Sequence, residues 1–131
     1  MASKEVIMKC ACVAVDIDHF PEFFEANTRT AVKKHKCSEC RRIIEAGERY
    51  EHVAGKWEGC FETFKMCSDC LSIRSSFFCE GYSFGGMLEE LGEHIDCMNG
   101  EISGDCIKPL TPRARAIVCD MIERVWTKDS Q

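Results

Sequence analysis

The chain has 131 residues and a formal net charge of −5 at pH 7, from 22 acidic and 17 basic side chains. That length suits a single domain, and the acidic balance argues against a general nucleic-acid-binding protein, which normally presents a basic surface. Eleven cysteines, with no apolar signal segment after Met1 and no apolar run of membrane-spanning length, predict a cytoplasmic protein whose reduced thiols bind metal.

The first 36 residues are predicted to form a strand followed by an extended segment. Apolar and polar residues alternate from Cys10 to Asp18, a pattern typical of a half-buried strand. Residues 21–25 predict either a short helical turn or an aromatic loop, and residues 28–32 predict an extended segment. Residues 1–36 would therefore lead into the cysteine-rich centre of the chain.

Two Cys-x-x-Cys pairs, separated by 26 residues, occupy that centre. At this spacing a tight turn aims both sulfurs of a pair at one metal, at about 2.3 Å. Four thiolates complete a tetrahedron and leave no position for water, so the pattern predicts a structural zinc ion that performs no chemistry. Two redox or disulfide pairs remain the alternative. The predicted ligands are Cys37, Cys40, Cys67 and Cys70.

The residues between and after the pairs predict a hairpin and a helix. Strands are expected over 48–53 and 61–66, with Gly55 and Gly59 on either side of the reversal and Trp57 at its tip. Cys70, Ile73 and Phe77 then share one face of a helix. A knuckle, a hairpin and a helix that carries the second ligand pair make a treble-clef-like zinc finger over residues 37–79. The predicted fold class is therefore α+β, with an N-terminal strand and two additional C-terminal helices.

Two amphipathic helices are predicted in the helical part, residues 84–127. The first runs from Phe84 to Asn99, where Asn99-Gly100 is a strong stop signal. The second begins at Thr111 as N-cap with Pro112 at the first helical position. Its apolar stripe is expected to pack on the hairpin and the first helix of the same chain, which favours a monomer over a homodimer.

Charge is distributed unevenly along the chain. Between Phe84 and Cys106 there is no Lys or Arg, and this acidic segment is interpreted either as a solvated helix face or as a surface for a basic partner. Residues 29–42 are basic instead, and either offset the charge of the thiolate site or bind an anion. The candidate binding residues are Glu89, Glu90, Glu93, Asp96 and Trp57.

The remaining cysteines leave a second metal site open as an alternative. His94 and Cys97 are three residues apart on one predicted helix, and other cysteines can join them. The competing interpretation is that free cysteines act as small buried apolar residues. The candidates for a second zinc are Cys10, Cys12, Cys79, His94, Cys97 and Cys106.

Four runs around the cysteine pairs carry a resemblance to a known group of proteins. They are His35-Lys-Cys-Ser-Glu-Cys, Gly47-Glu-Arg-Tyr, Gly55-Lys-Trp-Glu-Gly and Phe64-Lys-Met-Cys-Ser-Asp-Cys. The chain resembles a family of small phage- and prophage-encoded, cysteine-rich zinc-binding proteins of unassigned function. The resemblance implies a phage origin and the cytoplasm of a bacterial host, and it carries over no catalytic residue.

No enzyme signature is present: there is no phosphate loop, no His-Glu-x-x-His and no nucleophile elbow. The expected function is a non-enzymatic, zinc-stabilised module that binds a host or phage protein, with inhibition of a host defence system (an anti-CRISPR role) as one form of it. The alternative is a nucleic-acid-binding regulator that uses the basic segment 29–42.

Overall fold

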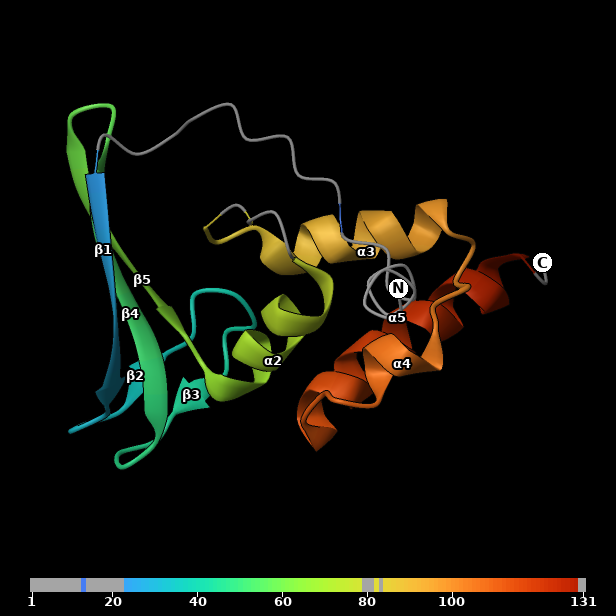
Figure 1. The fold of residues 1–131 in the computed structure, drawn as a ribbon, viewed down its shortest axis with the longest axis horizontal. Helices are drawn as coiled ribbons and strands as arrows, with labels where there is room; N and C mark the ends of the chain where they lie inside the picture. The colour runs from blue at the N-terminus through green and yellow to red at the C-terminus, as the bar shows by residue number, and fades with distance from the viewer. Residues whose placement is uncertain (1–12, 14–22, 79–81, 83, 130–131) are drawn as a thin grey trace, which may run out of the picture.

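A computed structural model describes residues 13, 23–78, 82 and 84–129, to which the structural account is confined (Figure 1). The predicted strand from Cys10 to Asp18 lies outside the described residues except for Val13, which is buried and donates its backbone N–H to the Phe77 carbonyl at 2.8 Å. The elements are β1 (Phe23–Thr30), β2 (His35–Lys36), β3 (Ile43–Ile44), β4 (Arg49–Trp57), β5 (Cys60–Met66), α2 (Ser68–Phe77), α3 (Met87–Cys97), α4 (Gly104–Ile107) and α5 (Pro112–Asp129).

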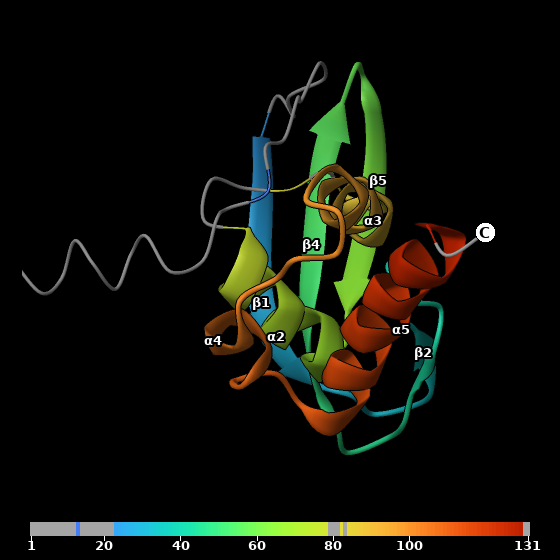
Figure 2. The same ribbon diagram turned by 90° about the vertical axis from the view of Figure 1, so that its right-hand side faces the viewer.

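An antiparallel sheet in the order β1-β4-β5 forms one layer, and the helices lie on one of its faces (Figures 1 and 2). β2 and β3 make a separate two-stranded sheet around the first cysteine pair. The mixed α+β class is therefore confirmed. The inner face of the large sheet, with Val53 and Met66, packs toward the helices and contributes to the buried interior.

The hairpin is longer than predicted. β4 continues through Gly55 to Trp57, which pairs with Cys60, and the reversal is made by Glu58 and Gly59 at φ values of 48° and 83°. Two consecutive positive φ values favour the tight turn that matches strand twist. Gly55 is thus not part of the reversal, and Trp57 is not at its tip. A Cβ atom on Gly55 would lie 2.7 Å from the Trp57 ring, so glycine is needed for the indole to cover the strand.

The prediction for residues 21–25 was wrong where the structure describes them. Phe23 to Glu25 begin strand β1, which pairs with β4 from the Phe23–Lys56 pair to the Thr30–Arg49 pair. β1 has no strong local pattern, because all its residues are exposed and it lies at an edge of the sheet. Its conformation depends on hydrogen bonds to β4, which local sequence does not report.

α5 packs within the chain, against α2 and α3, while α2 lies between α5 and the sheet (Figure 1). The side chains of Ala114, Val118 and Ile122 are buried with those of Leu91 and Ile95. The predicted apolar stripe of α5 is confirmed. It packs on α2 and α3, whereas the sequence predicts packing on the hairpin and α3. The helices therefore share one continuous core with the sheet, to which α2 contributes Ile73 and Phe77 and the sheet contributes Tyr50 and Met66.

The predicted helix ends are confirmed at two of three positions. Thr111 accepts the Ala114 N–H at its Oγ1 at 3.2 Å, the N-cap geometry expected before Pro112. Gly100 has a φ of 75° and donates to the Ile95 carbonyl at 2.9 Å, which terminates α3. α3 starts at Met87 rather than at Phe84, because the Phe84 ring stacks on Phe64 at 5.3 Å in an aromatic cluster beside the sheet.

Candidate metal centre

The four predicted ligands meet at one point. The sulfur atoms of Cys37, Cys40, Cys67 and Cys70 all lie within 4.8 Å of one another. The Cys37–Cys70 and Cys40–Cys67 sulfur pairs are 3.8 and 3.6 Å apart. Four sulfurs at about 2.3 Å from a zinc ion form a tetrahedron with edges of about 3.8 Å, whereas a disulfide is about 2.05 Å long. The arrangement therefore fits a single tetrahedral metal ion and excludes two disulfides among these four free thiols.

Local structure at each pair aims the sulfurs inward. Cys37 and Cys40 lie in the turn between β2 and β3, where Arg41 takes a φ of 68° and donates its N–H to the Cys37 carbonyl at 3.1 Å. Cys67 is the N-cap residue of α2, so Cys70 lies in its first turn. The Cys67 N–H points at the Cys37 sulfur at 3.4 Å. A helix N-terminus and backbone N–H groups both favour thiolates.

Burial closes the centre. Cys37, Cys67 and Cys70 have no exposed surface, and Cys40 is only partly exposed. The pKa of Cys40 lies far below its ordinary value, first because Cys37 and then because the other thiols hydrogen-bond to its sulfur. The pKa of Cys70 is raised, first by its hydrogen bond with Cys37, then by those with Cys40 and Cys67, and further by burial. The four thiols cannot all ionise without a bound cation, so metal binding would release protons.

The acidic residue inside each pair holds a helix. Glu39, between the first two cysteines, accepts the backbone N–H groups of Gly85 at 2.7 Å and Met87 at 2.9 Å, and so caps α3. Asp69, between the second two, accepts the Thr111 hydroxyl at 2.7 Å and so holds the N-cap residue of α5. The metal centre is thereby joined directly to both long C-terminal helices.

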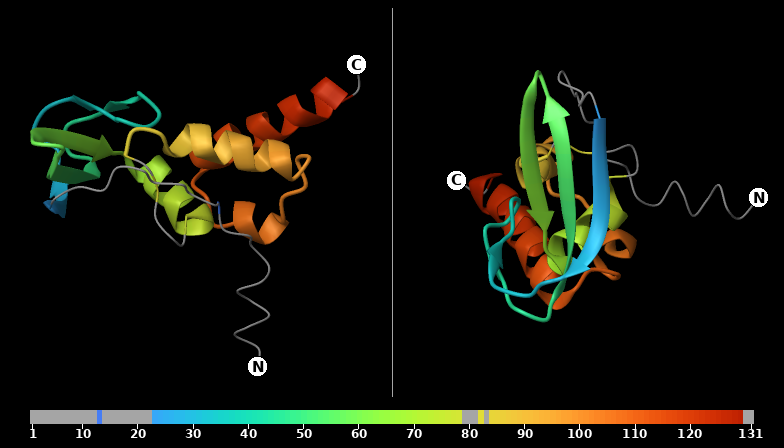
Figure 3. Two further views of the ribbon diagram at one scale, coloured as in Figure 1. Left: turned by 90° about the horizontal axis from the view of Figure 1, so that it is seen from above. Right: turned by 90° about the vertical axis from the view of Figure 1, so that its left-hand side faces the viewer.

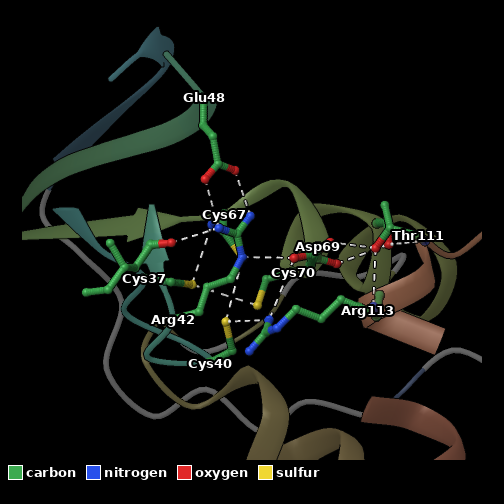
Figure 4. Close-up of polar contacts among 12 residues, drawn as sticks. Cys37, Cys40, Arg42, Glu48, Cys67, Asp69, Cys70, Thr111 and Arg113 are labelled. Atoms are coloured by element: carbon green, nitrogen blue, oxygen red, sulfur yellow. Dashed lines mark hydrogen bonds and ion pairs between the residues drawn. The ribbon is translucent and has the colours of Figure 1, made fainter. Parts of the chain in front are cut away.

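Arg42 links the two pairs (Figure 4). Its Nε donates to Asp69 at 2.9 Å, and its two terminal nitrogens donate to the Glu48 carboxylate at 3.0 and 2.9 Å. The bidentate contact lowers the pKa of Glu48 to about 2, chiefly through the hydrogen bonds from Arg42. These contacts tie the first knuckle and the start of β4 to the first turn of α2.

Arg113, from the first turn of α5, approaches the sulfurs directly. Its Nη1 donates to the Cys40 sulfur at 3.2 Å and lies 3.7 Å from an Asp69 oxygen. Four thiolates with one divalent ion carry a charge of about −2. A guanidinium at this distance offsets part of that charge and favours the ionised form of the Cys40 thiol.

The cysteine spacing predicts the four sulfurs but not the residues that surround them. Glu39, Arg42, Asp69, Thr111 and Arg113 come from three separated stretches of the chain. One signal was available: both pairs carry an acidic residue immediately before the second cysteine. The role of these two carboxylates cannot be read locally, because each binds the start of a helix far along the chain. Glu39 and Gly85 are 46 residues apart in the sequence, and Asp69 and Thr111 are 42 residues apart.

The candidate binding residues lie apart from the metal centre. Glu89, Glu93 and Asp96 are exposed on α3, and Glu90 is half-buried. Trp57 packs its ring against Phe64 and Phe84 at 5.5 and 5.4 Å, in the aromatic cluster. The structure therefore keeps the α3 carboxylates together on one helix and places the half-buried Trp57 in ring contacts with Phe64 and Phe84.

The basic segment 29–42 contains some cations that form ion pairs and others that are exposed. Arg42 is engaged with Glu48 and Asp69, and Lys34 lies 3.9 Å from Glu45. Lys36 and Arg41 are exposed beside the first pair, and Arg29 projects from β1.

Among the described residues the four-cysteine cluster is the only group that could hold a metal ion. Cys97 is exposed and His94 is half-buried, and burial lowers the pKa of His94. Cys106 is buried and disulfide-bonded, which removes it as a thiolate ligand. The candidates Cys10, Cys12 and Cys79 lie outside the described residues.

Comparison with known proteins finds no match: no family model, no curated protein sequence and no solved structure is significantly similar to this chain. The resemblance to phage-encoded cysteine-rich proteins therefore stays a prediction. Among the described helices, none combines the length and apolar character that crossing a bilayer requires.

Proposed function

We propose that the chain is a non-enzymatic binding module whose fold is held by one structural zinc ion at Cys37, Cys40, Cys67 and Cys70. The observation that carries this proposal is the cluster of four sulfurs within 4.8 Å of one another, of which the Cys40–Cys67 and Cys37–Cys70 pairs are 3.6 and 3.8 Å apart. A tetrahedral four-thiolate set suits zinc or a single iron and offers no open position to a substrate. The ion therefore acts as a structural cross-link between the two cysteine pairs.

The order of the elements supports a treble-clef arrangement. A knuckle between β2 and β3 carries the first pair, β4 and β5 form the hairpin, and α2 begins at the second pair. β5 leads straight into the site, since the Lys65 carbonyl accepts the Ser38 N–H at 2.7 Å and the Ser38 hydroxyl accepts the Lys65 N–H at 2.9 Å. These two hydrogen bonds attach the first knuckle to the hairpin.

We infer that the partner is a host or phage protein with a basic surface, bound by the exposed carboxylates of α3. Glu89 and Glu93 project from a helix whose other face is buried through Met87, Leu91 and Ile95. Glu39 fixes the start of that helix to the metal centre, so the acidic surface is held rigidly. Pre-organised charge favours fast and specific association. A protein that normally holds nucleic acid in a basic groove, as a bacterial defence complex does, is the kind of partner that this surface fits.

Affinity capture from bacterial lysate tests the partner when wild-type bait is compared with matched variants. Glu89→Lys with Glu93→Lys should lose the captured protein or reduce it about tenfold, because charge reversal opposes a basic partner. Glu123→Lys, at an exposed position on α5, is the control and should capture as wild type does. Equal capture by all three proteins would discard the α3 surface as the binding site.

A further inference from the structure

In Figure 3 (right) the strands lie in front of the helices, so the other face of the three-stranded sheet is turned away from the helical layer. This face is covered at its Arg29 end, where Tyr50 is buried and its ring lies 5.1 Å from that of His35. Strand residues alternate between the two faces of a sheet. Val53 and Phe64 point toward the helical side, so Phe23, Lys56 and Phe61, which form one row across the three strands, point away from it. We call this surface the outer sheet face, defined by Phe23, Arg29, His52, Lys56, Phe61 and Lys65.

Two aromatic rings are displayed at one end of the outer sheet face. Phe23 and Phe61 are 56% and 73% exposed, and their ring centroids lie 5.9 Å apart in an edge-to-face arrangement. The Lys56 ammonium group lies 5.6 Å from the Phe61 ring centroid. Exposed aromatic rings beside a cation are costly to leave in water and are typical of a binding surface.

Cations continue along the same face. Lys65 is opposite His52 in the strand register, and Arg29 is two residues further along β1 from Asn27, the His52 partner. The pKa of His52 is lowered first by burial and then by Arg29, Lys65 and His35, so these charges are close together. Among the outward-pointing described residues of β1, β4 and β5, Glu25 is the only acidic one. A chain of net charge −5 thus presents one positively charged, aromatic face.

We propose that the outer sheet face binds single-stranded nucleic acid. Bases stack on Phe61 and Phe23, and phosphates contact Lys65 and Arg29. Phe61 and Lys65 are four residues apart on one strand, about 13 Å, which leaves room for a short run of nucleotides between ring and cation. An open sheet with exposed aromatic rings and flanking cations is suited to unstacked bases.

The same features disfavour other anionic partners. A duplex keeps its bases stacked inside the helix, so the two phenylalanine rings would have no partner there. An acidic peptide would satisfy the cations but would gain little from the rings. This site lies on the opposite side of the sheet from the helical layer that carries the α3 carboxylates (Figure 2), so it acts independently of the proposed protein partner.

Fluorescence anisotropy of the metal-loaded full chain tests the proposal. The probes are labelled oligodeoxythymidine and oligouridine of about 12 nucleotides and a duplex of equal length, at about 50 mM salt. Either single strand should bind at least about tenfold more tightly than the duplex. Phe61→Ala should weaken binding by about tenfold, since it removes the ring on which one base stacks. Lys65→Ala should reduce the slope of log affinity against log salt by about 0.7.

Matched controls come from the helical side. Met98→Ala removes a hydrophobic side chain that is 39% exposed, and Lys108→Ala removes an exposed cation. Both should bind single strands as wild type does, and metal content and melting temperature should be unchanged in every variant. Absence of single-strand binding, wild-type affinity of Phe61→Ala, or equal competition by polyglutamate would each overturn the proposal.

Discussion

The Arg42 guanidinium donates from Nε to the Asp69 carboxylate at 2.9 Å, and this ion pair joins the two halves of the metal centre. Both side chains are largely buried, at 18% and 12% exposure. Arg42 follows the first cysteine pair and Asp69 lies within the second. The Arg42–Asp69 ion pair therefore fixes the relative orientation of the two Cys-x-x-Cys segments, together with any metal ion that the sulfurs bind.

Asp69→Ala should lower the free energy of unfolding by about 3 kcal/mol. It leaves Arg42 partly uncompensated and removes the acceptor of the Thr111 hydroxyl, and breaking one partner of a buried pair is strongly destabilising. Denaturant unfolding of the metal-loaded protein measures the change. Asp120→Ala, in an exposed pair with Arg124, is the control and should change stability by less than about 0.5 kcal/mol. Similar costs for both variants would contradict the role given to Asp69.

Glu39→Ala should loosen α3 while leaving the metal bound. Its carboxylate accepts the Gly85 and Met87 N–H groups, and loss of such a cap costs about 1–2 kcal/mol. Hydrogen exchange should quicken at the first turn of α3 and stay unchanged in β4. Glu93→Ala on the exposed face of α3 is the control and should leave exchange as in wild type. Unaltered exchange in Glu39→Ala would show that the cap does not hold the helix.

The Arg42–Glu48 contact should make stability depend on pH at the acid end. Arg42 lowers the folded-state pKa of Glu48 to about 2 from an ordinary value of 4.5. A carboxylate with a lowered folded pKa stabilises fully above its unfolded pKa, and that contribution is lost as pH falls from about 4.5 toward 2. Carboxyl-carbon NMR at pH 4.5 should show Glu48 ionised in wild type and more protonated in Arg42→Ala, where only the Glu45 N–H still lowers its pKa. Burial raises the pKa of Glu39, so Glu39 should protonate before Glu48 does.

The apolar stripe of α5 should support the fold of the monomer. Val118 has no exposed surface and lies in the core with Leu91 and Ile95. Val118→Asp should therefore lower the free energy of unfolding by about 3 kcal/mol or more, because it buries a charge. Thermal melting combined with light scattering measures the result. A variant that stays as stable as wild type but changes from dimer to monomer would mean that this stripe serves a subunit interface instead.

Short sequence patterns correctly predicted the metal ligands and the start of α5. The spacing within each cysteine pair specified the ligand geometry, and Thr111-Pro112 specified the start of α5, because both depend on neighbouring residues alone. The extended conformation was predicted only for the Thr28–Thr30 end of β1; the start of the strand at Phe23 was not, because an exposed edge strand is defined by its hydrogen bonds to β4. Trp57 was placed at the hairpin tip because nothing local shows that Gly55 leaves space for its ring. The roles of Glu39 and Asp69 depended on distant helix ends, which no short-range pattern encodes.

Metal stoichiometry tests the central claim most directly, measured by elemental analysis on protein purified without chelator. We expect one zinc ion per chain, a loss of that ion in the Cys40→Ser and Cys67→Ser variants, and accompanying loss of the folded state, because structural zinc contributes about 10–16 kcal/mol to folding. Cys60→Ser and Cys119→Ser, which change exposed thiols, should keep both zinc and fold. Metal-free protein that is fully folded, or zinc retained at full stoichiometry and stability in Cys40→Ser and Cys67→Ser, would contradict the account.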